Sequence, residues 1–182
     1  MFNSENLINK VKLYNKFLNT EKLNKAYNFA IKAHKNQKRD SGDPYSNHPI
    51  AVANILTELK LDSATIATGL LHDTIEDTYA TYETIRVEFG QEVADLVDGV
   101  TKISVFENQA TLTSKVENFR KLILATSKDI RVLLVKIADR LHNMRTIDAI
   151  SKIEKKERIA KETMEIYAPL ADRMGMHGIR DE

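Results

Sequence analysis

Residues 131–147 read RVLLVKIADRLHNMRTI, and the largely apolar run VLLVKI at positions 132–137 decides the fold class. Taken alone, such a run is also compatible with a buried β-strand. The residues on either side of it continue the apolar pattern at helical spacing, and Asp129 can begin a helix just before it. We therefore favour helix over strand and expect this segment to be a helix in an all-α protein.

The scarcity of chain breakers also favours helices along the whole chain. Only 6 glycines and 3 prolines occur in 182 residues, about half of their usual share. With 42% hydrophobic and 29% charged residues, the chain resembles an ordinary globular protein that buries one sizeable core. We expect a single all-α domain over residues 1–182, a bundle of about eight to nine helices with no internal repeat or linker.

Apolar spacing, capping residues and glycines give the expected helix boundaries. Two S-x-x-E sequences, Ser114 to Glu117 and Ser151 to Glu154, match the capping box that opens a helix. The pattern weakens over residues 104–113, which are expected to form a loop that orders when a ligand binds. The expected helices cover, approximately, residues 7–18, 23–34, 49–59, 64–77, 82–90, 91–103, 114–126, 131–147 and 151–174.

Composition excludes several classes of protein and site. The chain has no cysteine, which excludes disulfides, thiolate metal sites, iron–sulfur clusters and a cysteine nucleophile. Its N-terminus is polar and no apolar stretch of about 18 residues occurs, so we expect neither a signal peptide nor a membrane span. A net charge of +1 gives no global basic field for nucleic acid. We expect a soluble, cytoplasmic protein without a nucleic-acid or membrane partner, and no oligomeric state follows from the sequence.

The sequence HDTIED at residues 72–77 concentrates one imidazole and three carboxylates. Residues four apart share a helix face, so the histidine would lie near Glu76, and Asp73 near Asp77. Repulsion makes such a cluster unfavourable unless water solvates it or a cation neutralises it. Two interpretations are open at this point: a metal site, and a polar helix end whose carboxylates face water.

A second polar group interrupts the apolar helix expected over residues 131–147. Asp139 lies among apolar residues, and a carboxylate in such a setting needs a partner. That partner is either a bound cation or a salt bridge to Lys136 or Arg140. Spacings of three, four and three place four polar residues in one stripe: Lys136, Asp139, Asn143 and Thr146.

A third candidate, His48, lies before Pro49 at the end of the Gly- and Pro-containing stretch SGDPYSNHP, at the start of the next expected helix, where a histidine often only caps or packs. Together with the two preceding groups it suggests a site of two imidazoles and two carboxylates. Such a donor set suits Mn²⁺, Fe²⁺ or Zn²⁺, and an oxygen-rich shell suits Mn²⁺ best. Because a metal acidifies bound water and polarises a phosphoryl oxygen, hydrolysis is the matching chemistry. The candidate ligands are His48, His72, Asp73 and Asp139.

The order H…HD…D resembles that of the HD-domain metal-dependent phosphohydrolases. Longer motifs narrow the resemblance to the hydrolase domain of the Rel/SpoT alarmone enzymes, in the same order and from about Tyr27 to the end of the chain. These motifs are AHKNQKRDSGDPYSNHP, GLLHDTIEDT, FGQEVADLVDGVTKIS, VKIADRLHNMRT and RIAKETMEIYAPLADRMGM.

The resemblance implies an all-helical domain that removes pyrophosphate from the 3′ position of guanosine tetra- and pentaphosphate with one Mn²⁺ per site. It implies that the four candidate ligands named above bind the metal. It also implies that Glu76 and Asp77 are the catalytic carboxylates and that Arg39 packs on the guanine base. The remaining pocket residues implied are Asn143 and Thr146, which contact the nucleotide, and Ser41, Tyr45 and Lys136, which line the same pocket.

These roles agree with simple chemistry. One turn beyond His72 and Asp73, the carboxylate of Glu76 can orient or deprotonate an attacking water. A flat guanidinium at Arg39 can stack on a purine, which a lysine cannot do equally well. The stretch KIEKKERIAK at residues 152–161 supplies further cations for the phosphates, although such a stretch is more often a solvated helix face. Its expected phosphate contacts are Arg158 and Lys161.

Two departures from the family pattern affect these expectations. Asp40 stands where the family usually has a basic residue, which is expected to weaken phosphate binding or to change the preference between guanosine substrates. The chain also stops at HGIRDE, so we expect no synthetase domain, whether it is a fragment of a longer enzyme or a short hydrolase. Two alternatives remain beside alarmone hydrolysis: an HD hydrolase of another nucleotide, and a non-catalytic alarmone-sensing module.

Overall fold

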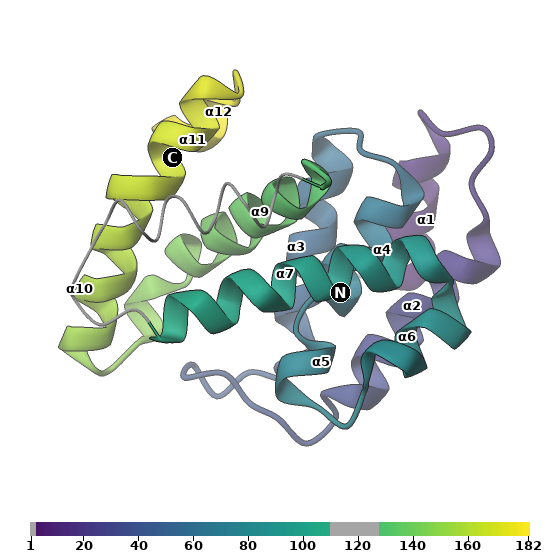
Figure 1. Cartoon of the computed structure of the whole chain (residues 1–182), viewed down its shortest axis with the longest axis horizontal. Coiled ribbons are helices and arrows are strands. Elements are labelled where there is room, and N and C mark those ends of the chain that lie inside the picture. The colour runs from purple at the N-terminus through teal and green to yellow at the C-terminus, as the bar shows by residue number, and fades with distance from the viewer. Residues whose placement is uncertain (1–2, 110–127) are drawn as a thin grey trace.

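The fold is a bundle of α-helices, as the computed structural model shows (Figure 1). The structure describes residues 3–109 and 128–182. Within these ranges there is no strand beyond an isolated bridge between Lys38 and Pro44, so the prediction of an all-α protein is confirmed. None of the helices in the described ranges is long and apolar enough to cross a membrane.

Four helices form the N-terminal part of the bundle: α1 (Ser4–Lys12), α2 (Thr20–Ala33), α3 (Asn47–Glu58) and α4 (Ser63–Leu71). Helix α4 packs against both α2 and α3 and buries nearly all of its side chains. The helix predicted over residues 7–18 is wrong in its second half, because α1 ends at Lys12. Asn15 and Asn19 accept hydrogen bonds from the backbone N–H groups two or three residues ahead and so favour a turn and a new helix start.

The middle of the chain contains α5 (Thr74–Asp77), α6 (Tyr82–Phe89) and α7 (Gln91–Gln109). The single helix predicted over 64–77 is divided at His72 and Asp73 into α4 and α5. The loop predicted over 104–113 is wrong for residues 104–109, because α7 continues through them. Ser104 is buried at this point, and its hydroxyl accepts a hydrogen bond from Lys136, so this polar residue has a partner inside the protein. The rest of that predicted loop and the helix predicted over 114–126 lie outside the described residues.

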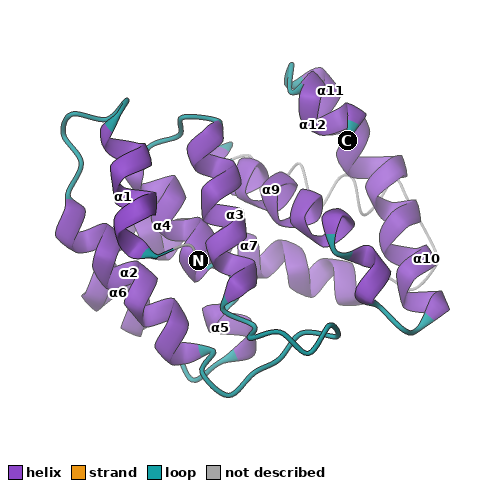
Figure 2. Ribbon diagram, turned by 180° about the vertical axis from the view of Figure 1, so that it is seen from behind, coloured by secondary structure: helices purple, strands orange, loops and turns teal. Residues whose placement is uncertain are grey.

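Helix α9 (Arg131–Arg145) contains the run VLLVKI and confirms helix over strand. It packs against α3, α4 and α7 and buries every residue from Val132 to Leu141 except Leu134. Figures 1 and 2 show it between the N-terminal helices at one end of the bundle and the C-terminal helices at the other. Residues from both ends of the chain therefore meet along α9.

The chain after α9 forms a 3₁₀ turn (Ile147–Ala149), α10 (Ile153–Glu162), a π-helical turn (Thr163–Tyr167), α11 (Ala168–Arg173) and α12 (His177–Asp181). The predicted capping box at Ser151 is wrong, since α10 begins after Lys152 without a side-chain cap. Arg140 joins this region to α9: its guanidinium lies 3.0 Å from a Glu162 carboxylate oxygen and 4.7 Å from the ring centre of Tyr167.

Candidate active site

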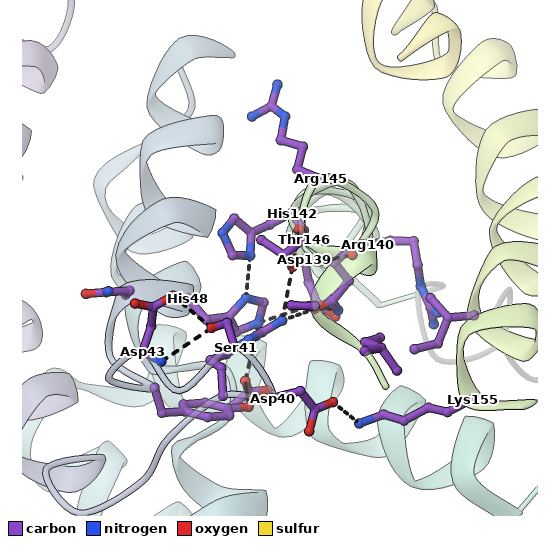
Figure 3. Close-up of a pocket in the computed structure, with 18 of the residues that line it drawn as sticks. Asp40, Ser41, Asp43, His48, Asp139, Arg140, His142, Arg145, Thr146 and Lys155 are labelled. Carbon is purple, nitrogen blue, oxygen red and sulfur yellow. Dashed lines mark hydrogen bonds and ion pairs between the residues drawn. The ribbon is translucent and has the colours of Figure 1, made fainter. Parts of the chain in front are cut away.

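Three residues from separate helical segments meet in a group that is suited to a metal ion. His48 is the second residue of α3, His72 caps the C-terminal end of α4, and Asp139 lies in α9. One ligand atom from each lies within 4.8 Å of the others, and all three residues are buried; Figure 3 shows two of them, His48 and Asp139. The structure thus brings together side chains that are 24 to 91 positions apart in the sequence.

Asp73 lies beside this group, because the break between α4 and α5 places it directly after His72. One carboxylate oxygen is 3.0 Å from His72 Nε2, and the other is 3.6 Å from His48 Nε2. All four predicted ligands therefore converge. Although it lies close to Asp73, the buried His72 Nε2 forms no hydrogen bond with any residue that the structure describes, which fits a nitrogen that would bind a cation. Two imidazoles and two carboxylates are also a donor set for a divalent metal, so the residues fit the ion that the sequence predicts.

The outer nitrogens of both histidines are held so that Nε2 faces the cluster. His72 Nδ1 lies 2.9 Å from the backbone carbonyl of Gly69 and donates to it, because a carbonyl can only accept. His48 Nδ1 lies 2.8 Å from Nδ1 of His142, a residue of α9. For His48 Nε2 to bind a metal, Nδ1 must carry the proton and His142 must accept it. Burial, His48 and Arg39 lower the pKa of His142 to about 4, which keeps it a neutral acceptor at pH 7.

His142 is a residue that the sequence analysis missed, although its position contained a signal. It lies three residues after Asp139 and so on the same face of α9. We expect His142→Phe, which removes the acceptor, to weaken Mn²⁺ binding by about 10- to 100-fold. His142→Gln, whose amide oxygen can accept the same proton, is expected to lose less. Calorimetric titration of the metal-free proteins with Mn²⁺ measures both, and equal affinities in the two variants would rule out an acceptor role.

The charges of the cluster favour a cation at its centre. Burial opposes ionisation of Asp73, but His72 and His48 outweigh it and lower its pKa. Burial likewise opposes the charge on Asp139, while Lys136 and the two histidines lower its pKa well below the usual range. Burial lowers the pKa of His72, but Asp73 and Asp139 outweigh that effect and raise it to about 9. The two carboxylates thus attract positive charge, which a proton on His72 or a metal ion can supply.

Asp139 makes the salt bridge that its sequence left open as one of two interpretations, and its other carboxylate oxygen is directed at the histidines. Its Oδ2 accepts a hydrogen bond of 3.1 Å from Lys136 Nζ, so the predicted salt bridge to Lys136 exists. Its Oδ1 lies 3.1 Å from His48 Nε2 and accepts a 2.7 Å hydrogen bond from Asn143 Nδ2. Lys136 is itself buried and donates a second bond to Ser104. The lysine and the asparagine therefore fix the carboxylate while one of its oxygens faces the histidines.

The two predicted catalytic carboxylates, Glu76 and Asp77, lie in the short helix α5 and line the same pocket. Burial and the charges of Asp73 and Asp77 raise the pKa of Glu76. Burial and Asp73 also raise the pKa of Asp77, which accepts a hydrogen bond of 3.1 Å from the Tyr45 hydroxyl. Tyr45 also donates to Asp73, at 2.8 Å, and so links α5 to the ligand cluster. A carboxylate with a raised pKa beside a metal-type cluster is a candidate proton acceptor.

Arg39 lies on the wall of the pocket that faces α9. Its Nη2 donates to Asn143 Oδ1 at 2.9 Å and to Thr146 Oγ1 at 3.4 Å, and its guanidinium is 5.7 Å from the ring centre of Tyr45. These contacts hold a planar cation in place at the pocket surface, which is the arrangement that stacking on a base requires. Three of the predicted nucleotide-contacting residues are therefore hydrogen-bonded to one another before any ligand binds.

A single cavity of about 720 Å³ joins these groups. Ser41 lines it and donates a 2.8 Å hydrogen bond to Asp43. On α10 the lining residues are three and four apart and include Arg158, whereas the predicted Lys161 is not among them. The predicted site residues that line the cavity are Arg39, Ser41, Tyr45, His48, Asp73, Glu76, Asp77, Lys136, Asp139, Asn143, Thr146 and Arg158.

Comparison with known protein families and structures agrees with this site. A family model described as HD domain matches residues 26–177. A solved structure described by the words "a metazoan ortholog of SpoT hydrolyzes ppGpp" superposes with a TM-score of 0.63 at 29% identity, covering 79% of this chain and 84% of that one. The likeness therefore includes the fold of most of the chain.

Longer bacterial proteins are also similar. "GTP pyrophosphokinase rsh" of Brucella melitensis is 53% identical over 182 residues, which is 100% of this chain and 24% of the relative. "Bifunctional (p)ppGpp synthase/hydrolase SpoT" of Escherichia coli strain K12 is 51% identical over 162 residues, 89% of this chain and 23% of the relative. These matches confirm the resemblance to the Rel/SpoT enzymes, and the chain spans about a quarter of the length of these curated relatives.

Proposed function

The chain belongs to the HD domain family, and from that membership and the geometry of its pocket we propose that it hydrolyses the 3′-pyrophosphate of guanosine tetra- and pentaphosphate. The observation that carries the proposal is the meeting, in one cavity, of the His/Asp cluster, the carboxylate of Glu76 and the planar cation of Arg39. The relatives named for (p)ppGpp hydrolysis support the choice of substrate.

In the proposed reaction the chain binds the metal ion and accepts a proton, and it also recognises the base. One divalent ion, which we propose is Mn²⁺, would be held by His48, His72, Asp73 and Asp139. When bound, it would polarise the phosphoryl oxygens and acidify a water molecule. Glu76 accepts a proton from water as the water oxygen attacks the phosphorus nearest the ribose. The bond between that phosphorus and the 3′ oxygen breaks, and the 3′ oxygen takes up the proton that Glu76 accepted, which leaves a 3′-hydroxyl on GDP or GTP and free pyrophosphate.

Arg39 provides the proposed recognition of the base. We expect Arg39→Ala to raise KM for guanosine tetraphosphate by about tenfold with little change in kcat, because the stacked cation binds ground state and transition state alike. Arg39→Lys should recover only part of this loss, since an ammonium cannot stack as a plane. Lys35→Ala is the matched control, because Lys35 is an exposed cation of the same segment outside the cavity lining. A KM unchanged in Arg39→Ala would remove this residue from base binding.

The sequence is also compatible with an HD hydrolase of another nucleotide and with a non-catalytic alarmone-sensing module. Substrate tests separate both from alarmone hydrolysis. A panel of nucleotides, with and without a 3′-pyrophosphate and with guanine or adenine, is assayed in the presence of Mn²⁺. The proposal expects turnover only when guanine and a 3′-pyrophosphate occur together. Turnover of a deoxynucleotide or a dinucleotide phosphate instead would identify an HD hydrolase of another nucleotide. Alarmone binding without turnover in metal-loaded protein would identify a sensing module.

A further inference from the structure

An ion pair joins opposite walls at the mouth of the cavity. Asp40, in the loop between α2 and α3, and Lys155, in the first turn of α10, both line the cavity. Lys155 Nζ donates to Asp40 Oδ2 at 3.0 Å, as the dashed line in Figure 3 shows. The two side chains are 49% and 46% exposed, so the pair lies at the entrance and not on the floor of the cavity.

The loop directs neighbouring side chains to different walls. Arg39 binds Asn143 and Thr146 of the α9 wall, whereas Asp40, the next residue, binds the α10 wall. A tight turn fixes this arrangement: the Arg39 N–H donates a backbone hydrogen bond of 3.0 Å to the Asp43 carbonyl, and Gly42 adopts a positive φ of 87° within the turn. A carboxylate is thereby held next to the residue that we propose binds the base.

Asp40 also weakens the attraction of the α10 wall for an anion. Lys155 and Arg158 are three residues apart, line the cavity on the same face of α10 and are its two cations there. Arg158 forms no ion pair within residues 3–109 and 128–182, whereas Lys155 is paired with Asp40. A phosphate group that approaches this wall therefore competes with Asp40 for Lys155 and is repelled by its charge.

We propose that the Asp40–Lys155 pair determines how strongly the site responds to the number of phosphates at the 5′ position of its nucleotide. This inference rests on the proposed function, in which the 3′-pyrophosphate lies at the His/Asp cluster and the base lies at Arg39. The 5′ phosphates are then the remaining charged part of the substrate. Among the cations of the cavity lining, which also include Lys38 and Arg145, we assign to them Lys155 and Arg158 of the α10 wall. With Asp40 in place, each added 5′ phosphate raises the affinity of the site only a little, so the tetra- and pentaphosphate have similar kcat/KM values.

Kinetic comparison of 5′ variants tests this inference. We compare two guanosine 3′-diphosphates, one with a 5′-triphosphate and one with a 5′-monophosphate. The ratio of their kcat/KM values, triphosphate over monophosphate, is measured for the wild type, Asp40→Asn, Lys155→Gln and the double variant. We expect Asp40→Asn to raise the ratio about fivefold and Lys155→Gln to lower it. In the Lys155→Gln background the effect of Asp40→Asn should shrink, because most of it comes from releasing Lys155.

A matched control separates the pair from general charge. Asp148 also lines the cavity, but its partner at 2.7 Å is Lys156, which does not. Asp148→Asn should leave the ratio as in the wild type. An unchanged ratio in Asp40→Asn, or an equal rise in Asp148→Asn, would overturn the inference.

Binding measurements distinguish failure of this inference from failure of the proposed function. Calorimetry with GMP, GDP and GTP, none of which has a 3′-phosphate to lose, gives the affinity gained per 5′ phosphate in metal-loaded protein. A steeper gain in Asp40→Asn supports the inference even if no 3′-pyrophosphate is hydrolysed. The same gain in both proteins contradicts it even if hydrolysis is rapid.

Discussion

Asp139→Asn is expected to abolish metal binding and hydrolysis together. Asp139 offers a charged oxygen to the cluster, 3.1 Å from His48 Nε2, and an amide oxygen at the same place carries no charge to hold a divalent ion. Because partners outside the ligand set already contribute about 10- to 100-fold in metal affinity, loss of a ligand should cost more than about 100-fold. We expect kcat/KM for guanosine tetraphosphate to fall by about 10³-fold or more, measured alongside elemental analysis of the dialysed protein.

The substitution must be separated from damage to the fold, because Asp139 is also the partner of buried Lys136. Breaking a buried ion pair from one side costs about 3–5 kcal/mol of folding free energy. Asp73→Asn provides the second variant, since its carboxylate contacts both histidines and has no lysine partner within the described ranges. Both variants should retain a helical circular-dichroism spectrum and lack the metal. Full metal occupancy in folded Asp139→Asn would remove this residue from the ligand set.

Glu76→Gln is expected to keep the metal and to lose the chemical step. Glu76 lies in α5, outside the His/Asp cluster but within the same cavity, and a glutamine has the same shape without a basic oxygen. Removing a general base typically lowers the rate by about 10²- to 10⁴-fold, so we expect kcat to fall within this range while KM changes little. Steady-state kinetics with Mn²⁺ at saturation measure both constants.

Glu83→Gln is the matched control for Glu76. Glu83 is an exposed glutamate of α6 that pairs with Arg86 on the surface and is absent from the cavity lining. Its substitution should leave kcat and metal content as in the wild type. If Glu76→Gln lost the metal, Glu76 would belong to the ligand set; if it kept wild-type kcat, another residue would be the base.

The sequence predicts the metal cluster better than it predicts the surroundings of that cluster. His48, His72 and Asp139 meet because most side chains of α3, α4 and α9 are buried, and this burial dictates how the three helices pack. The break between α4 and α5 was not predicted, because the helical pattern continues across His72 and Asp73. That break is a tertiary feature: it allows Asp73 to face both histidines while Glu76 and Asp77 enter the cavity from the next turn.

Contacts between polar side chains that are far apart in the sequence were the hardest to predict. Nothing in the local sequence says that His142 faces His48, 94 positions away, or that Lys155 crosses the cavity mouth to Asp40, 115 positions away. The position of Lys161 outside the cavity lining has the same origin. Arg158 and Lys161 are neighbours on α10 by their spacing, but which residues of this helix reach the cavity depends on how α10 packs on the rest of the bundle.

Elemental analysis and a pyrophosphate-release assay on the same preparation test most directly whether the cavity is a metal-dependent alarmone hydrolase site. Protein reconstituted with Mn²⁺ is analysed for bound metal and incubated with guanosine tetraphosphate, before and after treatment with a chelator. We predict one Mn²⁺ per chain, release of GDP and pyrophosphate in equal amounts, loss of both metal and activity with the chelator, and recovery of both when Mn²⁺ is restored. Folded protein that holds Mn²⁺ and releases no pyrophosphate, or that releases it equally well without metal, would contradict this account.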